Sequence, residues 1–584
     1  MTHAAPTPGL AKKTKPQRGQ LGRGMPPRTT RTSAVRHRGH ATQSSPGKGI
    51  GPDRMADRDG PVQGRRPFTA GRRRARDAPS ARRSTMRPYA YDRLSFLDNS
   101  FLITESPTNH MHVAGTASYE AGPLRRPDGG IDIDRIRDYV ASRLHLIPRY
   151  RQVLAWTPIE GHPVWVDDAH FNIDYHVRHT SLPRPGDAQQ LKRLSGRIMS
   201  QQLDRSKPLW EMWIVEGLEG GERFAVITKV HHCMIDGMSS VDLLEVLLKS
   251  QPTDTIEPGP RWIARPAPRP RDLLWAEAVR RASMPFDLVR GFRRFLAEAE
   301  DPRSDLRAML RAVRDTVRST LRQVSDTPLN EQIGPHRRFD WLAMDLEEVK
   351  AVKKALGGSL NDVVLATVTG AVASFLEQRR VSVELLRFRV MAPVSVRTRE
   401  ERGTFGNRVS AWMIDLPLAE RDPRRRLEKI REQTERLKES KHALGAEMLT
   451  RVVEWTPSTL LSLGGRMVTR SLPFNLVVTN VPGPQVPLYL LGARMLDNYG
   501  QVPLTDFLGL GIVLFSYAGT LCWGFTADWD LVPDVAELVA GIEASFAELR
   551  QAAQGAPVEG APPARKPARG EGRVRPPETR VETA

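Results

Sequence analysis

The sequence contains little cysteine and shows no cluster of residues with the spacing of metal ligands. Cys233 and Cys522 are its only cysteines, which excludes a disulfide framework and fits a reducing compartment. Asp167, Asp168 and His170 stand close together, but we interpret them as a solvated turn. No glycine-rich nucleotide fingerprint occurs either, so we expect neither a metal nor a redox cofactor.

Long apolar segments are equally scarce. The N-terminus is polar and lacks the apolar core of a secretory signal. One uncharged run, residues 507–527, is long enough to cross a membrane, but four glycines interrupt it. We predict a hairpin instead, with strands at 511–517 and 520–527 joined at Ala518-Gly519. A soluble or peripheral protein is therefore expected rather than an integral one.

The net charge of +20 is spread unevenly. Residues 1–85 carry 20 Lys and Arg against 4 Asp and have almost no large apolar side chains, so we expect a disordered basic arm. Residues 555–584 add only +2, and we expect a disordered tail over 554–584. The part between is almost neutral and carries the globular patterning.

Three interpretations of the basic arm stay open. It could bind anionic lipid or nucleic acid, it could be disordered without a dedicated partner, or the native start could be Met86. Globular patterning begins directly after Met86. Phe68 is the only aromatic residue among the arginines, so nothing supports stacking on bases, and no nucleic-acid partner is expected.

The most informative stretch is His231-His232-Cys233-Met234-Ile235-Asp236-Gly237. The apolar residues 223–230 before it predict a strand, and residues 239–249 after it predict a helix. The heptapeptide is then a strand-to-helix loop, a common place for chemistry because rigid elements flank it. Side chains alternate along a strand, so His231 and His232 should point to opposite faces.

A histidine is mostly unprotonated at neutral pH, which suits removal of a proton from a hydroxyl group. For a random pair of histidines an inert, hydrogen-bonded role would be the better interpretation. The complete His-His-x-x-x-Asp-Gly pattern between a strand and a helix favours chemistry instead. Asp236 is close enough to fold back and brace the loop, and Gly237 gives the turn its backbone freedom.

Several further motifs occur in order around this heptapeptide: Leu94-Ser95-Phe96-Leu97-Asp98, Met111-His112-Val113, Pro208-Leu209-Trp210, Asn361-Asp362 and Phe405-Gly406-Asn407. Together they resemble the chloramphenicol-acetyltransferase-like acyltransferases, and within these the bacterial wax ester synthase/diacylglycerol acyltransferases. The resemblance covers about residues 86–550.

The resemblance implies an α/β (α+β) fold of two chloramphenicol-acetyltransferase-like subdomains with mixed sheets and an active-site channel at their interface. We assign residues 86–250 and 341–553 to the subdomains and 251–340 to a Pro- and Arg-rich helical linker. Arginines alternate with large apolar residues in this linker. It is either an interfacial helix that reaches lipid or an interdomain helix with a solvated basic face.

The resemblance also implies transfer of a fatty acyl group from acyl-coenzyme A to diacylglycerol or a long-chain alcohol, with acyl-coenzyme A as co-substrate and no cofactor. His232 would be the general base and His231 would support the loop. Asp236 would pair with an arginine rather than relay charge, with Arg151 as the first candidate, then Arg149 and Arg397.

Asn480 could donate to a developing oxyanion or line the substrate channel, or it could simply bond the adjacent turn. Asn361 could take part in the site, or it could only cap a helix over 363–376, a role that Ser359 could also fill. Cys233 allows a rival mechanism through an acyl-cysteine, although we prefer a small core residue.

Two other function classes stay open. One is a condensation-type or polyketide-associated acyltransferase acting on carrier-bound acyl groups, and the other is a lipid- or nucleic-acid-binding protein whose basic arm is the working part. We expect a cytoplasmic enzyme, peripheral at a membrane or lipid-inclusion surface.

Overall fold

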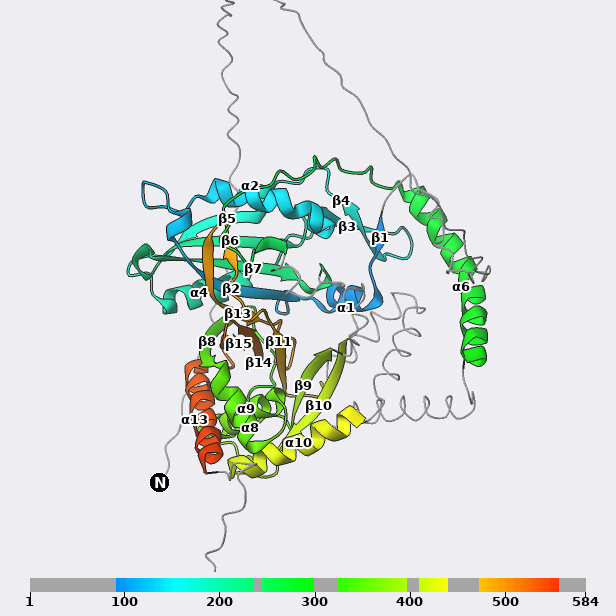
Figure 1. Cartoon of the computed structure of the whole chain (residues 1–584). Helices are drawn as coiled ribbons and strands as arrows, with labels where there is room; N and C mark the ends of the chain where they lie inside the picture. The colour runs from blue at the N-terminus through cyan, green and yellow to red at the C-terminus, as the bar shows by residue number, and fades with distance from the viewer. Residues whose placement is uncertain are drawn as a thin grey trace, which may run out of the picture. The chain divides into compact units, whose positions relative to one another are not determined.

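The computed structural model describes residues 91–234, 244, 246–298, 324–395, 409–439 and 472–555 (Figure 1). The basic arm, the C-terminal tail beyond residue 555 and the loop 235–243 lie outside these residues. The described part contains two six-stranded sheets and one of three strands.

The first sheet has the order β12-β13-β2-β7-β6-β5. Its strands are β2 (His112–Glu120), β5 (Val177–Ser181), β6 (Trp210–Leu218), β7 (Arg223–His231), β12 (Tyr489–Leu490) and β13 (Ala493–Gln501). Only β5 and β6 pair in parallel; the other neighbours are antiparallel. Two strands of the second half of the chain, β12 and β13, thus complete a sheet of the first half.

The second sheet has the order β10-β9-β11-β14-β15-β8. Its strands are β8 (Arg337–Asp345), β9 (Phe388–Ser395), β10 (Val409–Leu416), β11 (Leu476–Pro482), β14 (Leu510–Tyr517) and β15 (Thr520–Asp528). β11 runs parallel to β9 and β14. Both large sheets are therefore mixed, which confirms the predicted fold class.

The third sheet joins β1 (Asp92–Arg93), β4 (Pro163–Asp167) and β3 (Gln152–Trp156). The helices are α1 (Phe96–Thr104), α2 (Ile133–Arg143), α3 (Ile173–His176), α4 (Ala188–Met199), α6 (Pro270–Glu298), α8 (Leu346–Leu356), α9 (Leu360–Gln378), α10 (Pro423–Glu439) and α13 (Val535–Gln554). Short 3-10 helices include η3 (Pro148–Arg151) and η5 (His232–Met234).

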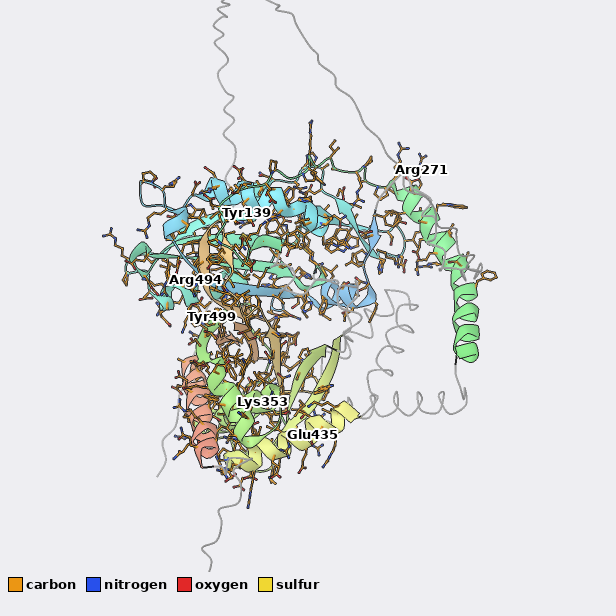
Figure 2. All side chains as sticks on the ribbon, viewed as in Figure 1. Tyr139, Arg271, Lys353, Glu435, Arg494 and Tyr499 are labelled. Atoms are coloured by element: carbon orange, nitrogen blue, oxygen red, sulfur yellow. The ribbon has the colours of Figure 1, made fainter. Side chains whose placement is uncertain are left out.

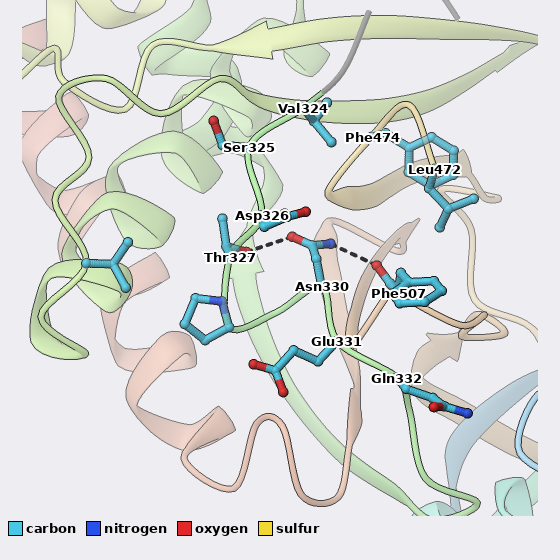
Figure 3. Close-up of a pocket in the computed structure, with 12 residues that line it drawn as sticks. Val324, Ser325, Asp326, Thr327, Asn330, Glu331, Gln332, Leu472, Phe474 and Phe507 are labelled. Carbon is cyan, nitrogen blue, oxygen red and sulfur yellow. Dashed lines mark hydrogen bonds between the residues drawn. The ribbon is translucent and has the colours of Figure 1, made fainter. Parts of the chain in front are cut away.

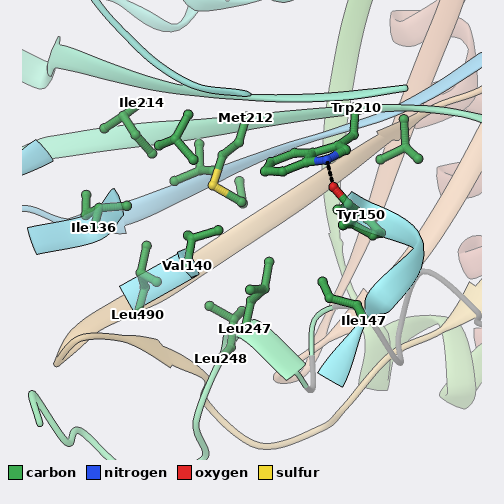
Figure 4. Packing of buried hydrophobic residues seen from close by; sticks show 14 of the residues in the cluster. Ile136, Val140, Ile147, Tyr150, Trp210, Met212, Ile214, Leu247, Leu248 and Leu490 are labelled. Carbon is green, nitrogen blue, oxygen red and sulfur yellow. Dashed lines mark hydrogen bonds between the residues drawn. The ribbon is translucent and has the colours of Figure 1, made fainter. Parts of the chain in front are cut away.

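The described residues form two large apolar cores, and the first includes residues from both halves of the chain, such as Ile136 and Phe515. In the first, α2 lays Ile136 and Val140 against Met212 and Ile214 of β6 (Figure 4). In the second, α9 is buried along most of its length among strands and helices. α9 is long and apolar enough to span a membrane, but 72% of its apolar stretch is buried inside the protein, as in a core helix.

Local sequence signals explain several elements. Ser359 caps α9, and its side chain and that of Asp362 each accept a backbone N–H of the other residue. The predicted hairpin is confirmed, because β14 and β15 pair antiparallel across Ala518 and Gly519, whose φ angles are 45° and 86°. Positive φ at both turn positions matches the twist of a two-residue hairpin.

Candidate active site

The two histidines of the heptapeptide lie where β7 ends. His231 is the last residue of β7 and pairs with His112 of β2, while His232 opens η5. The N–H of His231 donates to the carbonyl of Leu209 at 2.9 Å, and the N–H of His232 donates to that of Met111 at 2.8 Å. The Pro-Leu-Trp and Met-His-Val motifs therefore hold the histidine backbone from two sides.

The imidazole of His232 stacks on the ring of Phe101 from α1. The ring centroids are 4.0 Å apart and the planes differ by 27°. The residue is half-buried, and its Nδ1 is buried without a hydrogen-bond partner among the described residues. Burial lowers the pKa of His232 to about 4, and contact with its own backbone carbonyl offsets this only in part. The ring is therefore neutral at pH 7, as a general base requires.

His231 contacts Glu105, the C-cap residue of α1. Its Nε2 lies 3.6 Å from a carboxylate oxygen of Glu105, and its Nδ1 accepts the N–H of Cys233 at 3.2 Å. Because Nδ1 accepts, a neutral His231 carries its proton on Nε2, directed at the carboxylate. This arrangement fits the supporting role expected for His231.

Glu105 is a buried carboxylate whose side chain is only 1% exposed. Arg205 donates to it through Nε at 3.0 Å and also through Nη2, and Nε2 of His112 lies 3.6 Å away. Burial alone would raise the pKa of Glu105, but the contacts with His112, His231 and Arg205 together bring it below its usual range. Glu105 therefore stays ionised against the histidines.

Sequence analysis missed both Phe101 and Glu105. They lie four residues apart on α1, so they share one face of the helix, and this face touches both histidines. Phe101 lies three residues beyond the Leu-Ser-Phe-Leu-Asp motif and Glu105 seven residues beyond it. An acidic residue at helical spacing from an aromatic one was the only available signal.

Cys233 does not have the surroundings of a nucleophile. Its side chain is fully buried, and burial raises the pKa of the thiol well above its ordinary value, with the charges of Asp98 and Glu105 adding to the effect. A thiolate is needed for attack on a thioester. The geometry therefore favours the small-core-residue interpretation over an acyl-cysteine.

The brace around the loop lies partly outside the described residues, because Asp236, Gly237 and Arg397 are not among them. Arg151 is described. Its guanidinium donates to the carbonyl of Ala141 at 3.0 Å and lies over the rings of Phe171 and Trp262. The pairing of Asp236 with Arg151 stays a prediction.

Asn480 and Asn361 are brought together from separate elements. Nδ2 of Asn480, near the end of β11, donates to Oδ1 of Asn361 in the first turn of α9 at 2.7 Å. The next residue, Val481, packs against the first core, which contains Cys233 and Met234. The end of β11 is thus directed toward the core of the histidine half, but an oxyanion or channel role for the two asparagines stays a prediction.

A pocket of about 1050 Å³ lies elsewhere (Figure 3). Thr327, Asn330, Phe474 and Phe507 are among its lining residues. Phe474 precedes β11, whereas Asn480 lies near its far end, roughly 20 Å away at about 3.3 Å per residue. The pocket is therefore at the opposite end of the strand from Asn480, and we do not assign it to the acyl-transfer site.

Similarity to known proteins decides the family. Residues 94–364 match the wax ester synthase/diacylglycerol acyltransferase catalytic domain, and residues 405–550 match the C-terminal domain of the same family. The chain belongs to the wax ester synthase/diacylglycerol acyltransferase family. It is an acyltransferase of that family, as the ordered motifs predicted.

Relatives in this family come from Mycobacterium tuberculosis. A "Probable diacylglycerol O-acyltransferase" of strain H37Rv is 31% identical over 464 residues, covering 78% of this chain and 95% of the relative. Another protein of that strain, provisionally named a diacylglycerol O-acyltransferase, is 33% identical over 471 residues, covering 79% and 96%.

The fold is shared with a solved member of the family. The wax ester synthase/diacylglycerol acyltransferase from Marinobacter aquaeolei VT8 aligns with a TM-score of 0.55 at 24% identity, covering 79% of this chain and all of the other. The similarity shows that this chain shares its fold with that protein.

Proposed function

We propose that this acyltransferase transfers a long-chain fatty acyl group from acyl-coenzyme A to the hydroxyl of diacylglycerol, of a long-chain alcohol, or of both. The observation that carries this proposal is the position of the His232 imidazole, which is held at the end of β7 by two family motifs and stacked on Phe101. Membership of the family and the names of the mycobacterial relatives support the substrate class.

In the proposed reaction His232 removes the hydroxyl proton while the oxygen attacks the thioester carbonyl. The tetrahedral intermediate then collapses, the carbon–sulfur bond breaks, and the imidazolium gives its proton to the departing thiolate. The products are an ester and free coenzyme A. Because burial disfavours the imidazolium, His232 returns its proton readily once the leaving group has formed.

The remaining residues have supporting roles in this proposal. His231 and the buried carboxylate of Glu105 fix the end of β7 on one side of the base. Asn480, oriented by its bond to Asn361, would donate to the oxyanion or line the channel. Asp236 with Arg151 would brace the loop, and Gly237 would allow its turn.

We further propose that the enzyme works in the cytoplasm, peripheral at a membrane or lipid-inclusion surface. Both acceptors are nearly insoluble in water, so the acyltransferase must meet them at the surface of a lipid phase. The extended, arginine-rich segment before α6 and the exposed aromatic residues of that helix support this location.

The test uses the purified full chain with labelled palmitoyl-coenzyme A, and with diacylglycerol and hexadecanol as separate acceptors. His232→Ala is expected to lower kcat by about 10²–10⁴-fold, while Cys233→Ala keeps most of the activity. Circular dichroism and thermal unfolding check that both variants are folded. Substantial turnover by folded His232→Ala contradicts the mechanism, and reaction with a carrier-bound acyl group but not with palmitoyl-coenzyme A favours the condensation-type alternative.

A further inference from the structure

Helix α6 is attached to the rest of the protein by its polar side. Glu277 accepts from Nη1 of Arg93 at 2.8 Å, and Glu160, in the turn between β3 and β4, lies 3.8 Å from Arg280 and 3.5 Å from Arg281. Near its start, Leu273 is buried against Val164 and Val166 of β4. Ion pairs thus form most of the described attachment.

The opposite side of α6 is apolar and open to solvent. Trp275, Val279 and Phe286 are 73%, 49% and 72% exposed. Their spacings of four and seven residues place them on one stripe, about 180° around the helix from Glu277 and about 120° from Arg280. We call Trp275, Val279 and Phe286 the α6 outer face. A helix of a water-soluble protein normally shows the reverse polarity.

The neighbouring hairpin adds a strained apolar tip. Ile159, next to Glu160 between β3 and β4, is 95% exposed and has a φ of 70°. A β-branched residue rarely adopts this conformation, whereas glycine and asparagine adopt it at a lower energetic cost. An isoleucine that is both strained and almost fully exposed is consistent with a site that binds another molecule.

The surroundings of the α6 outer face are basic. Arg265, Arg280 and Arg281 form ion pairs with Asp167, Glu277 and Glu160. Arg261, Arg269 and Arg271, in the segment before the helix and at its start, are exposed (Figure 2). Trp and Phe beside arginines are the side chains that sit at the boundary between headgroups and acyl chains. A second copy is a poorer partner, because a two-fold contact would oppose like arginines.

We propose that the α6 outer face, together with Ile159, docks the enzyme on an anionic lipid bilayer. The inference rests on the proposed function, since an acceptor dissolved in lipid is what gives such a surface a use. Trp275, Val279 and Phe286 enter the headgroup–acyl boundary, and Arg271 pairs with lipid phosphates. The ion pairs of Glu277 and Glu160 keep the helix fixed on the β3–β4 sheet while it is inserted.

Vesicle sedimentation of the full chain tests this surface. The probes are phosphatidylcholine vesicles with and without phosphatidylglycerol, at low salt and at about 0.5 M NaCl, where the charge of the basic arm is screened. Trp275→Ser/Phe286→Ser is expected to weaken binding to the anionic vesicles at least about 10-fold at both salt concentrations. The matched control is Leu385→Ser, because Leu385 is 97% exposed in the second half of the chain.

A second measurement separates this proposal from the proposed function. With a short-chain acyl-coenzyme A and a water-soluble alcohol, Trp275→Ser/Phe286→Ser should be as active as the original chain, whereas transfer to diacylglycerol in vesicles should fall. The single variant Trp275→Phe, which keeps an aromatic side chain at this position, should keep most of the vesicle binding of the original chain. Unchanged sedimentation of the double variant at high salt overturns the docking surface even if acyl transfer is intact. Conversion of a dimer into a monomer without loss of vesicle binding assigns the surface to self-association instead.

Discussion

The ring of Phe101 covers one side of the His232 imidazole at a centroid distance of 4.0 Å. This contact removes part of the imidazole from water and contributes to the burial that lowers the pKa of His232 to about 4. Phe101 is therefore a positioning residue for the proposed base, and it comes from a helix more than 120 residues earlier in the chain.

Replacing Phe101 should move the pH profile of the enzyme. In Phe101→Ala the imidazolium becomes better solvated, so the pKa of His232 rises toward its ordinary value of 6.5. The acidic limb of kcat/KM then shifts to higher pH, and activity at pH 6 falls relative to activity at pH 8. Phe101→Tyr keeps the stacking surface and serves as control. A proportional loss at every pH would indicate a structural role only.

Removing the charge of Glu105 should loosen the support of His231. Glu105→Gln leaves His231 and Arg205 facing a neutral amide. A hydrogen bond to a charged group contributes about 1.5–3 kcal/mol. Losing that contribution to the position of His232 corresponds to a roughly 10–150-fold fall in kcat/KM. Glu160→Gln removes another buried carboxylate that is paired with arginine, in the turn between β3 and β4, and should leave kcat/KM unchanged with soluble substrates. Equal effects of the two substitutions on kcat/KM would refute the assignment.

The contact between the two large sheets should not tolerate an added methyl group. A Cβ at position 524 of β15 would overlap the carbonyl oxygen of Gly500 in β13. Gly524→Ala is therefore expected to lower the free energy of unfolding by about 1–3 kcal/mol or more, measured by urea titration. Gly122→Ala has no heavy atom within 4 Å of the new Cβ and should be neutral.

Four histidines whose pKa is lowered to about 4 or less should make the fold sensitive to mild acid. Burial lowers the pKa of His112 to about 3, and those of His162, His176 and His232 to about 4. The unfolded chain, with pKa values near 6.5, binds more protons than the folded chain between about pH 4 and 6.5. The contribution of these neutral histidines to the free energy of unfolding is therefore fully present above pH 6.5. It declines as the pH falls through this window, by at most about 1.4 kcal/mol per pH unit for each histidine.

Urea midpoints at intervals between pH 7.5 and pH 4.5 measure this effect. His145→Gln removes an exposed histidine and should leave the slope unchanged. His176→Phe removes one of the four histidines and should reduce the slope, although it also removes the bond between Nδ1 of His176 and the carbonyl of Trp210. A midpoint that does not change down to pH 5 would contradict the proposed linkage.

Features that depend on local sequence were predictable. The strand before the histidines, the 518–519 turn and the Ser359 cap each follow from side chains within a few positions of one another. Family motifs in order were enough for the fold and for His232 as the candidate base. Asp236 could be proposed in the same way, but its position is not described.

Features that depend on pairing across long stretches of chain were not predictable. Nothing within residues 489–501 distinguishes a strand that stays in the second sheet from one that joins the first. The interaction of Glu105 with His231 links residues 126 positions apart, and it depends on how α1 packs against η5. The inverted polarity of α6 likewise needed a structure, because the alternation of arginine and apolar residues was compatible with either side facing the protein.

The position of β13 has a consequence for how the chain is made. β2 is a central strand of the finished sheet, but its outer neighbour is residues 493–501, translated about 260 residues after β7 ends. At about 5–20 residues per second a ribosome needs roughly 15–50 s to supply it, and during that time the backbone of β2 has an open edge to which other chains can pair. Slowing translation between the two halves should therefore raise the share of chains that aggregate.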